Sequence, residues 1–332
     1  MKKTRFIVIL LCMVLCMPVG MSVSAQTGYF NEYNSVYEAK DSNGCSSMQG
    51  MCIDRKENKL YYIKKDNKDT KAVISCLDLS KEKVTKTELK YKTKKGKKTS
   101  KTSTISGLVH ANDMEFVRIG NTSYLYVVTI SEKSYQLVKL KVNGKTYETV
   151  ASYKVYGTEK KDGKKVTKKI AVSGISLIGE TDENLIFMMK KGSKIYKATV
   201  GKNLGNKKSV NLSSGCTLKL KESKIKGKKI SNIGKYLSQG LTYYEGKVFV
   251  PYTNENVSVI FVFSIDGNQD LPKEVVGDSN LSFRITSKAF SMFEIESCAI
   301  AADGKLYFNC NTNGTDRIAY FKNKSNVFTF GA

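Results

Sequence analysis

The chain of 332 residues has no tryptophan, three prolines and a single histidine, His110. One imidazole excludes a zinc site built from several histidines, although His110 could still act as a lone general base. A Gly-rich phosphate loop, a C-x-x-C pair and a nucleophile-elbow motif are absent as well. The sequence therefore lacks the common signatures of nucleotide-binding, redox and α/β-hydrolase proteins.

Long regular patterns are also scarce. No stretch beyond the N-terminus is long and apolar enough for a transmembrane helix, and none shows a clear amphipathic helical period. Tyrosine, isoleucine, valine and threonine instead gather in short runs that turn residues separate. Such runs are typical of strands, so they predict an all-β fold.

The N-terminus begins with three basic residues, continues with an apolar run over residues 6–21, and reaches small residues up to Ala25. This order predicts a secretory signal peptide over residues 1–25, with an N-terminal membrane anchor as the alternative. We therefore predict a secreted, extracellular protein, either free or associated with the cell wall. Residues 26–44 are predicted to be a tether or a ring-closing strand, and residues 45–332 a single domain.

Net charge and cysteine content give further information about the surroundings of the protein. The net charge is +25, and +22 once the signal peptide is removed, with lysine supplying almost all of the excess. Such an imbalance indicates polyanionic surroundings and solubility rather than a fold. Export permits disulfides, and Cys45 and Cys52 are the first pair to test, but sequence alone does not determine pairing. The cysteines after residue 25 are Cys45, Cys52, Cys76, Cys216, Cys298 and Cys310.

One short pattern, polar-small-apolar-x-apolar, occurs five times, and its copies begin between 57 and 66 residues apart. Each copy opens a strand and is followed by further strands and turns. A repeat of this period indicates a propeller, because one blade cannot bury both of its faces alone. We predict a five-bladed β-propeller of four-stranded antiparallel blades, with six blades as the alternative. The copies begin at Gln49, Asn112, Ser173, Gln239 and Glu296.

These five leading residues are predicted to form a polar ring at the mouth of the central channel. Their amide and carboxylate oxygens suit a sugar or a hard cation such as calcium. No cofactor is otherwise expected. The alternative is structural, in which the ring residues bond neighbouring blades and channel water.

Lysine-rich segments connect three pairs of blades, at residues 92–101, 158–169 and 221–229. In a propeller these connections emerge on the face where the inner strands begin, so we expect the lysines and the ring to share a face. Few aromatics interrupt the lysines, which favours a phosphate-attracting surface over specific nucleic-acid recognition. A merely solvated surface is the alternative. The lysines of this predicted surface are Lys94, Lys95, Lys97, Lys98, Lys160, Lys161, Lys164, Lys165, Lys226, Lys228 and Lys229.

Catalysis at the channel mouth is a second hypothesis, with Glu296, Asp113 and His110 as candidates. Glycoside cleavage needs a pair of carboxylates, and Glu115 and Glu294 are also available. Only Glu296 holds the ring position, since Asp113 occupies the glycine position of its copy. One aligned acid favours a non-catalytic protein.

The segments HANDM at residues 110–114, SQGL at 238–241 and EIES at 294–297 resemble the blade-start motifs of helveticin-J-type bacteriocin proteins and teichoic-acid-protein-C-type propellers. The resemblance, spread over roughly residues 48–321, implies a propeller in a Gram-positive extracellular setting that binds the cell surface or acts against bacteria. It implies no catalytic set. The chain departs from that group in its lysine-rich connections and at Ser173.

Taken together, the sequence predicts a monomeric, non-catalytic, secreted propeller that binds an anionic wall polymer or surface glycan through the lysines and the ring. It predicts no specific nucleic-acid partner and no membrane span. The alternatives are a glycan-active or lactone-active enzyme that uses the central funnel, and a bacteriocin-like protein.

Overall fold

The computed structural model describes residues 29–30, 33–95, 98–130, 136–161, 164–203, 208–220, 224–225, 228–286 and 290–322. Among these residues the only helix is the short 3₁₀ turn η1, Ile233–Lys235, and the rest of the regular structure is strand. The predicted all-β class is confirmed. The predicted signal peptide lies outside the described residues.

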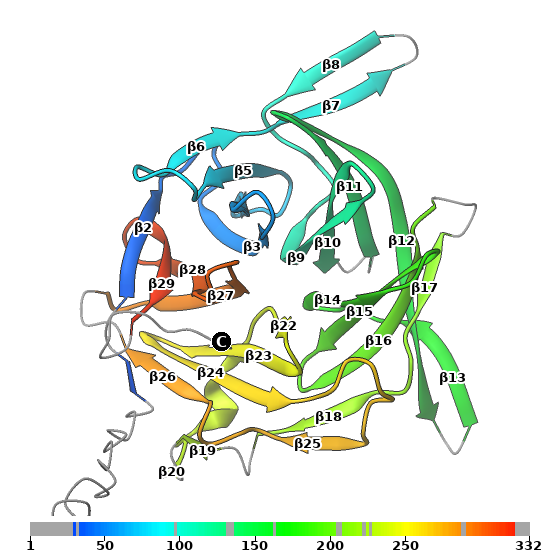
Figure 1. Ribbon diagram of the computed structural model, residues 1–332, viewed down its shortest axis with the longest axis vertical. Coiled ribbons are helices and arrows are strands. Elements are labelled where there is room, and N and C mark those ends of the chain that lie inside the picture. The colour runs from blue at the N-terminus through cyan, green and yellow to red at the C-terminus, as the bar shows by residue number, and fades with distance from the viewer. Residues whose placement is uncertain are drawn as a thin grey trace, which may run out of the picture.

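The strands are arranged as a propeller. Figure 1 shows one strand from each of five sheets around the centre of the view, with the other strands farther out, and we call this innermost strand the first strand. We name each sheet after this first strand. The five strands are β3 Ser47–Asp54, β9 His110–Ile119, β14 Gly174–Glu180, β22 Thr242–Tyr244 and β27 Phe293–Ile300.

Two of these sheets have the four strands predicted for a blade. The β3 sheet has the order β3-β4-β5-β6, with β4 Lys59–Lys65, β5 Ala72–Asp78 and β6 Thr85–Glu88. The β27 sheet has the order β2-β29-β28-β27, with β2 Tyr33–Ala39, β28 Leu306–Thr312 and β29 Asp316–Phe321. The antiparallel pairing of β2 with β29 places an early and a late segment of the chain in one sheet.

The other three sheets are larger, so the prediction of uniform four-stranded blades is not confirmed. The β9 sheet adds β7 Lys90–Lys95, β8 Lys98–Thr102, β10 Thr122–Ile130, β11 Gln136–Asn143, β12 Thr146–Lys161, β13 Lys164–Lys169 and β17 Ser209–Asn211. The β14 sheet adds β15 Asn184–Lys191, β16 Lys194–Gly201, β18 Cys216–Lys219 and β25 Glu274–Val276. The β22 sheet adds β1 Tyr29–Phe30, β21 Leu237–Ser238, β23 Lys247–Asn254, β24 Val257–Ser264 and β26 Phe283–Thr286. A separate hairpin pairs β19 Lys224–Ile225 with β20 Lys228–Lys229.

Local sequence explains much of this order. The central strand β24 is a nearly continuous run of valine, isoleucine and phenylalanine, and its partner β23 contains Val-Phe-Val, as expected for strands that are buried on both faces. Between β22 and β23 the hairpin turns at Glu245 and Gly246, both with positive φ, which matches the twist of the flanking strands.

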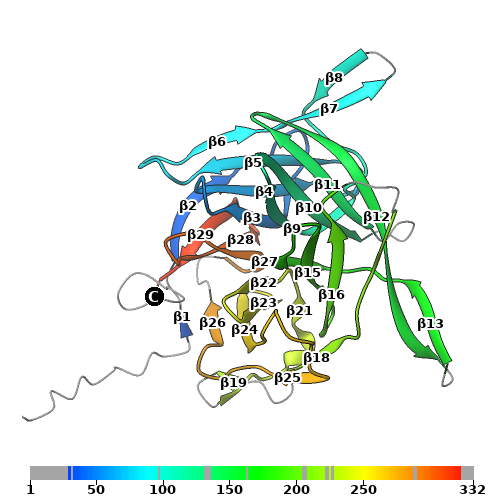
Figure 2. The ribbon, with the colours of Figure 1, turned by 45° about the vertical axis from the view of Figure 1, so that its right-hand side comes forward.

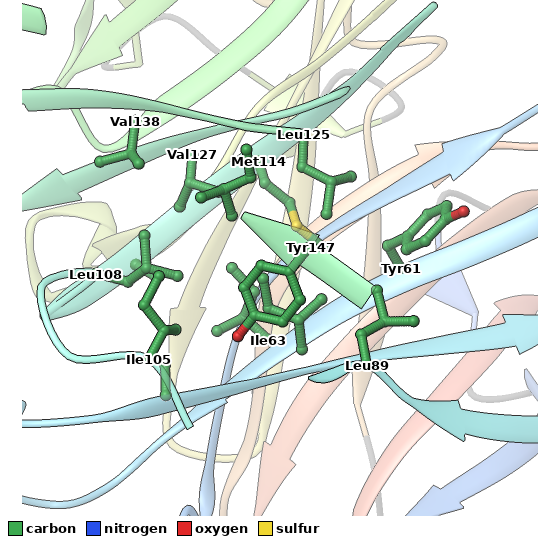
Figure 3. Close-up of a cluster of buried hydrophobic side chains, with 14 of the residues drawn as sticks. Tyr61, Ile63, Leu89, Ile105, Leu108, Met114, Leu125, Val127, Val138 and Tyr147 are labelled. Atoms are coloured by element: carbon green, nitrogen blue, oxygen red, sulfur yellow. The ribbon is translucent and has the colours of Figure 1, made fainter. Parts of the chain in front are cut away.

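Neighbouring sheets pack through apolar side chains. Figure 3 shows one such cluster, in which Tyr61 and Ile63 of β4 meet Met114 of β9 and Val127 of β10. Burial of each large apolar side chain contributes roughly 1.5–3 kcal/mol, so these interfaces between sheets hold the ring together. Further clusters join the remaining neighbours.

At Gly50 the structure shows why the repeated pattern has a glycine. A β-carbon added there would lie 2.7 Å from both Cα and the carbonyl carbon of Asp113 in the next sheet. Gly240 is similarly tight, with its added β-carbon 2.9 Å from the Asp113 carboxylate. The small position of the pattern therefore allows first strands to approach one another at the centre.

Replacing Gly50 by alanine tests this close approach. Backbone atoms cannot move aside as a flexible side chain can, so we expect Gly50→Ala to lower the free energy of unfolding by about 1–3 kcal/mol. The matched control is Gly179→Ala in β14, where an added β-carbon meets no heavy atom within 4 Å. That variant should be neutral or slightly more stable, and urea unfolding of both compares them. Equal effects at the two glycines would contradict the packing argument.

Candidate functional site

The axis of the propeller has two chemically different ends. The leading residues of the repeated pattern lie in the first halves of the first strands or just before them, and we call this end the blade-start end. The later halves of the same strands and the turns after them line a cavity, with Asp54, Glu115, Ser176, Tyr244 and Ile300 among its walls. We call this the turn end. Sequence reasoning considered only the first of them.

Between the two ends Asp113 forms a hub. Its side chain is 1% exposed, and its Oδ2 accepts hydrogen bonds from the backbone N–H groups of Ile175 and Leu241, each at 3.0 Å. Its Oδ1 accepts a bond from the Ser297 hydroxyl at 2.8 Å. One carboxylate thus joins the β9 sheet to the β14, β22 and β27 sheets. Asp113, predicted as a catalytic candidate, is enclosed by partners in the centre of the ring.

Burial raises the pKa of Asp113 to about 7, even though its three donors favour the ionised form. The three hydrogen bonds offset part of the cost of burying this carboxyl group.

Four of the predicted ring residues make polar contacts at the blade-start end. Gln239 Nε2 donates to Glu294 Oε1 at 2.6 Å, which links the β22 and β27 sheets. Asn311 Nδ2 donates to Glu296 Oε1, and Ser173 Oγ accepts a bond from Lys190 at 3.0 Å. Gln49 is 3% exposed and its Nε2 donates to the carbonyl of Met48 at 2.6 Å. The structure thus brings predicted residues together with charged groups that the prediction did not include.

Two acceptors at this end have no partner among the described residues. They are Gln49 Oε1 and Asn112 Oδ1, both shielded from solvent. A buried amide oxygen without a hydrogen bond is costly, which favours a ligand or water that donates to it. Both amides could therefore accept bonds from hydroxyl groups.

The Glu294–Glu296 pair is the most perturbed part of this end. Glu296 is 5% exposed, and its burial, together with the neighbouring Glu294 carboxylate, raises its pKa well above the usual range. The register of β27 against β28 shifts between Ile295 and Ser297, so a bulge falls at Glu296. Comparable shifts fall near Gln49 and Asn112. Bulges re-aim side chains and are frequent beside active sites.

Lys190 of β15 lies beside the ring and is a buried amine. It is 0% exposed, and its Nζ donates to the hydroxyls of Ser238 at 2.7 Å and Ser173 at 3.0 Å. Burial lowers the pKa of Lys190 to about 7, although the Asp113 carboxyl favours its charged form. An amine that is partly neutral near pH 7 can accept a proton from a bonded hydroxyl.

His110, the remaining catalytic candidate, is half-buried. Its Nδ1 lies 3.4 Å from Asp69 Oδ2, and Lys65 pairs with the other oxygen of Asp69 at 2.7 Å. The imidazole is thus oriented by a carboxylate in the neighbouring β3 sheet.

The lysine-rich segments do not form the shared surface that the sequence predicted. They belong to three hairpins, β7–β8, β12–β13 and β19–β20, and Figures 1 and 2 both show β8, β13 and β19 at separate edges of the molecule. Lys164 and Lys165 in β13 are exposed, whereas Lys97 and Lys226 lie outside the described residues. The connections extend as hairpins because their strands pair with each other and not across the blade-start end.

The cavity at the turn end was missed. Its polar walls include Glu115, which accepts bonds from the Ser176 hydroxyl at 2.8 Å and the Leu177 backbone at 3.1 Å. Asp54 pairs with Arg118 at 2.5 Å. A sequence signal existed, because a charged residue stands near the end of several first strands or just after it, as at Asp54 and Glu245.

Other predicted features can be placed as well. The six cysteines after residue 25 are free, including Cys45 and Cys52, the first pair to test, and all except Cys76 are buried. Among the described residues no group of three or more histidine, cysteine or acidic side chains could hold a metal. Nor does this part of the chain contain a helix suited to crossing a membrane.

No known protein family matches the sequence, and no curated protein matches it either. Solved structures share its fold. They include a glycosyl hydrolase from Bacteroides ovatus, at 10% identity over 92% of this chain and 98% of that one, with a TM-score of 0.42. A thermostable family-43 glycoside hydrolase gives 9% identity over 88% and 96%, with a TM-score of 0.48. Glutaminyl cyclase from Myxococcus xanthus gives 9% identity over 90% and 98%, with a TM-score of 0.44.

With TM-scores below 0.5 these likenesses carry no conclusion about this chain, and its propeller arrangement rests on its own sheets. The structures are named as enzymes, and none supports the helveticin-J-type or teichoic-acid-protein-C-type group, so that resemblance stays a prediction. The prediction of a non-catalytic protein that binds through a lysine-rich face is wrong. Its lysines diverge on separate hairpins, whereas the perturbed acids and amine gather at the axis.

The pH dependence of stability tests the Asp113 hub. The unfolded carboxyl group titrates near 3.8 and the folded one near 7, so folding binds a proton between these values. Stability from this group is therefore complete below about pH 4 and is lost as pH rises through about 7. In Asp113→Asn the amide oxygen can keep both backbone bonds, and the amide nitrogen can donate to the Ser297 hydroxyl.

We expect Asp113→Asn to fold and to remove this part of the decline in unfolding free energy between pH 4 and pH 7. Chemical unfolding of both proteins at several pH values gives the difference between their unfolding free energies at each pH. The contributions of the other buried acids are the same in both proteins and cancel in this difference. Parallel pH profiles for the two proteins would show that Asp113 is ionised in the folded state.

Proposed function

We propose that the protein is a glycan-active hydrolase whose catalytic site is the blade-start end of the axis. The observation that carries this proposal is the Glu294–Glu296 pair, two carboxyl groups in different environments at the centre of the ring. Enzymes that cleave glycosides use such a pair, in which one acid stays protonated and the other carboxylate is ionised. Because their environments differ, one carboxyl group can act as the acid and the other as the base.

The roles follow from the surroundings. Glu296 is buried and has a strongly raised pKa, which suits the general acid that protonates the leaving oxygen. Glu294 is more exposed and accepts a bond from Gln239, which suits the carboxylate that activates water or stabilises positive charge. The unpartnered amide oxygens of Gln49 and Asn112 would accept bonds from sugar hydroxyls.

Replacement of the acid tests this assignment. We expect Glu296→Gln to lower kcat on natural or poorly activated glycosides at least about 100-fold, because glutamine cannot donate a catalytic proton. The loss should be much smaller for dinitrophenyl glycosides, whose leaving group needs little protonation. Glu82→Gln, in an exposed turn between β5 and β6, is the matched control.

The assay is a panel of aryl glycosides and wall glycans with the mature protein. Hydrolysis that survives unchanged in Glu296→Gln, or no hydrolysis across the panel, would refute the proposed function.

Hydrolysis of an ester or lactone is a second candidate, favoured by the Lys190–Ser238 contact. A neutral Lys190 would take the proton as Ser238 Oγ attacks the carbonyl carbon, and would then return it to the leaving alkoxide. Water hydrolyses the resulting acyl-serine in the second step, so atoms and charge balance. Ser238 lies opposite Tyr252 in the strand register, and the Tyr252 hydroxyl interacts with the Ser238 side chain.

Serine-directed labelling tests this second candidate. We expect a fluorophosphonate to modify Ser238, faster as pH rises through about 7 because the amine must be neutral. Lys190→Met should slow the labelling at least about tenfold, and Ser173→Ala, which loses the other bond to the same amine, should slow it less. Mass spectrometry identifies the site, and labelling elsewhere or none would exclude this chemistry.

We also propose that each of the five larger sheets is one blade, and that the protein acts outside the cell. The five copies of the sequence pattern and the position of one copy at the start of each sheet support the blade count. The predicted signal peptide supports the extracellular setting. We also propose, from the sequence alone, that the channel can bind a cation such as calcium and that the protein is a monomer.

A further inference from the structure

We propose a second ligand site at the turn end of the axis, which binds a small organic carboxylate with an apolar body. The cavity there has a volume of about 540 Å³, which is in the range of small-molecule sites. It lies at the opposite end of the first strands from Glu294 and Glu296. The inference therefore does not depend on the proposed enzymatic function.

Apolar groups form much of the cavity wall. They include Met51, Met114, Leu241 and Ala299, which come from the first strands of different sheets or the residue before them. Burial raises the pKa of the Cys298 thiol, which also lines the cavity, so it remains uncharged there. Such a lining favours the hydrocarbon part of a ligand.

Four acids line this cavity, and all are engaged by neighbouring groups, Glu245 by the Tyr244 hydroxyl. Asp54 pairs with Arg118 at 2.5 Å, and Glu180 pairs with Lys202 at 2.9 Å. Glu115 accepts bonds from Ser176, Leu177 and the Phe116 backbone, and burial raises its pKa. These groups leave little reason for a cation to enter.

Arg55 is held differently, by partners that leave its charge uncompensated at close range. It belongs to the turn after β3, yet its Nε donates to the carbonyl of Ile300 in the β27 sheet at 2.9 Å. Its guanidinium carbon lies 4.7 Å from the centre of the Tyr244 ring in the β22 sheet. Both of these partners also line the cavity.

The consequence is a guanidinium that spans three sheets at the cavity wall. No ion pair of Arg55 with an acid is found in the described part of the chain, and Nε is its only nitrogen with a hydrogen bond there. Glu115 is the acid whose charge interacts with that of Arg55, and its carboxylate is already bonded to three donors. The two terminal nitrogens can form the paired bonds that a carboxylate accepts.

A matched pair of ligands and a matched pair of variants test this site. Octanoate carries the carboxylate and an apolar chain, whereas octanamide keeps the chain and loses the charge. We expect calorimetric titration to show saturable binding of octanoate, at least about tenfold tighter than octanamide, and weaker at high salt. Arg55→Gln should weaken octanoate binding about tenfold or more.

Lys56, in the same turn, also lines the cavity, so Lys56→Gln compares a lone ammonium with the guanidinium that Ile300 and Tyr244 hold. It should change octanoate affinity less than about threefold. Ala299→Phe places a bulky side chain against the cavity and should reduce binding of both ligands. If octanoate does not bind, if octanamide binds as tightly, or if Arg55→Gln and Lys56→Gln act alike, the proposed site is overturned. Glycoside and ester hydrolysis should be unchanged in Arg55→Gln.

Discussion

A buried carboxyl group at the centre of the ring is the constraint on which the rest of the structure depends. Asp113 accepts hydrogen bonds from two backbone amides and one hydroxyl, each from a different neighbouring sheet. A lone carboxyl group at 1% exposure is costly to bury, and these bonds offset much of that cost. Because the donors lie on first strands, the same bonds hold the position of those strands around the axis.

The hub explains why the two ends of the axis differ in chemistry. At the blade-start end, bulges near Gln49, Asn112 and Glu296 turn polar side chains toward one another. At the turn end regular strands present apolar side chains and the charged residues of the turns. One ring of strands therefore supports a charged, hydrogen-bonded cluster and a largely apolar cavity.

The fold could be inferred from sequence because its signal is repeated. Each copy of the short pattern falls in or next to a first strand, although Gln49, Asn112 and Glu296 lie within the strand and do not open it. The alternation of apolar runs with turns predicted the all-β class. Blade size was not predictable, since strands such as β17 and β25 pair with strands that are not their neighbours in sequence. Such additions depend on which edges meet in space, and a local pattern does not record that.

The candidate site was inferred only in part. The ring position led to Gln239 and Glu296, but Lys190 and Glu294 lie at other places in the repeat and reach the ring through the fold. Asp113 stands where the other copies of the pattern have a small residue. Its role as an acceptor shared by several sheets could not be predicted, because it depends on how closely those sheets approach one another. Their position in the repeat predicted that the lysine-rich segments share one face. In the structure the strands of each segment pair as a hairpin that extends outward.

The sequence by itself determined the all-β class, the repeated first strand and the polar residues that lead it, because side-chain periodicity and turn chemistry are local. Tertiary structure alone decided which of those residues carry altered pKa values, since burial and neighbouring charges come from other sheets. It also decided where Arg55 points, because the carbonyl and the ring that hold it belong to segments nearly 200 residues or more away in the chain.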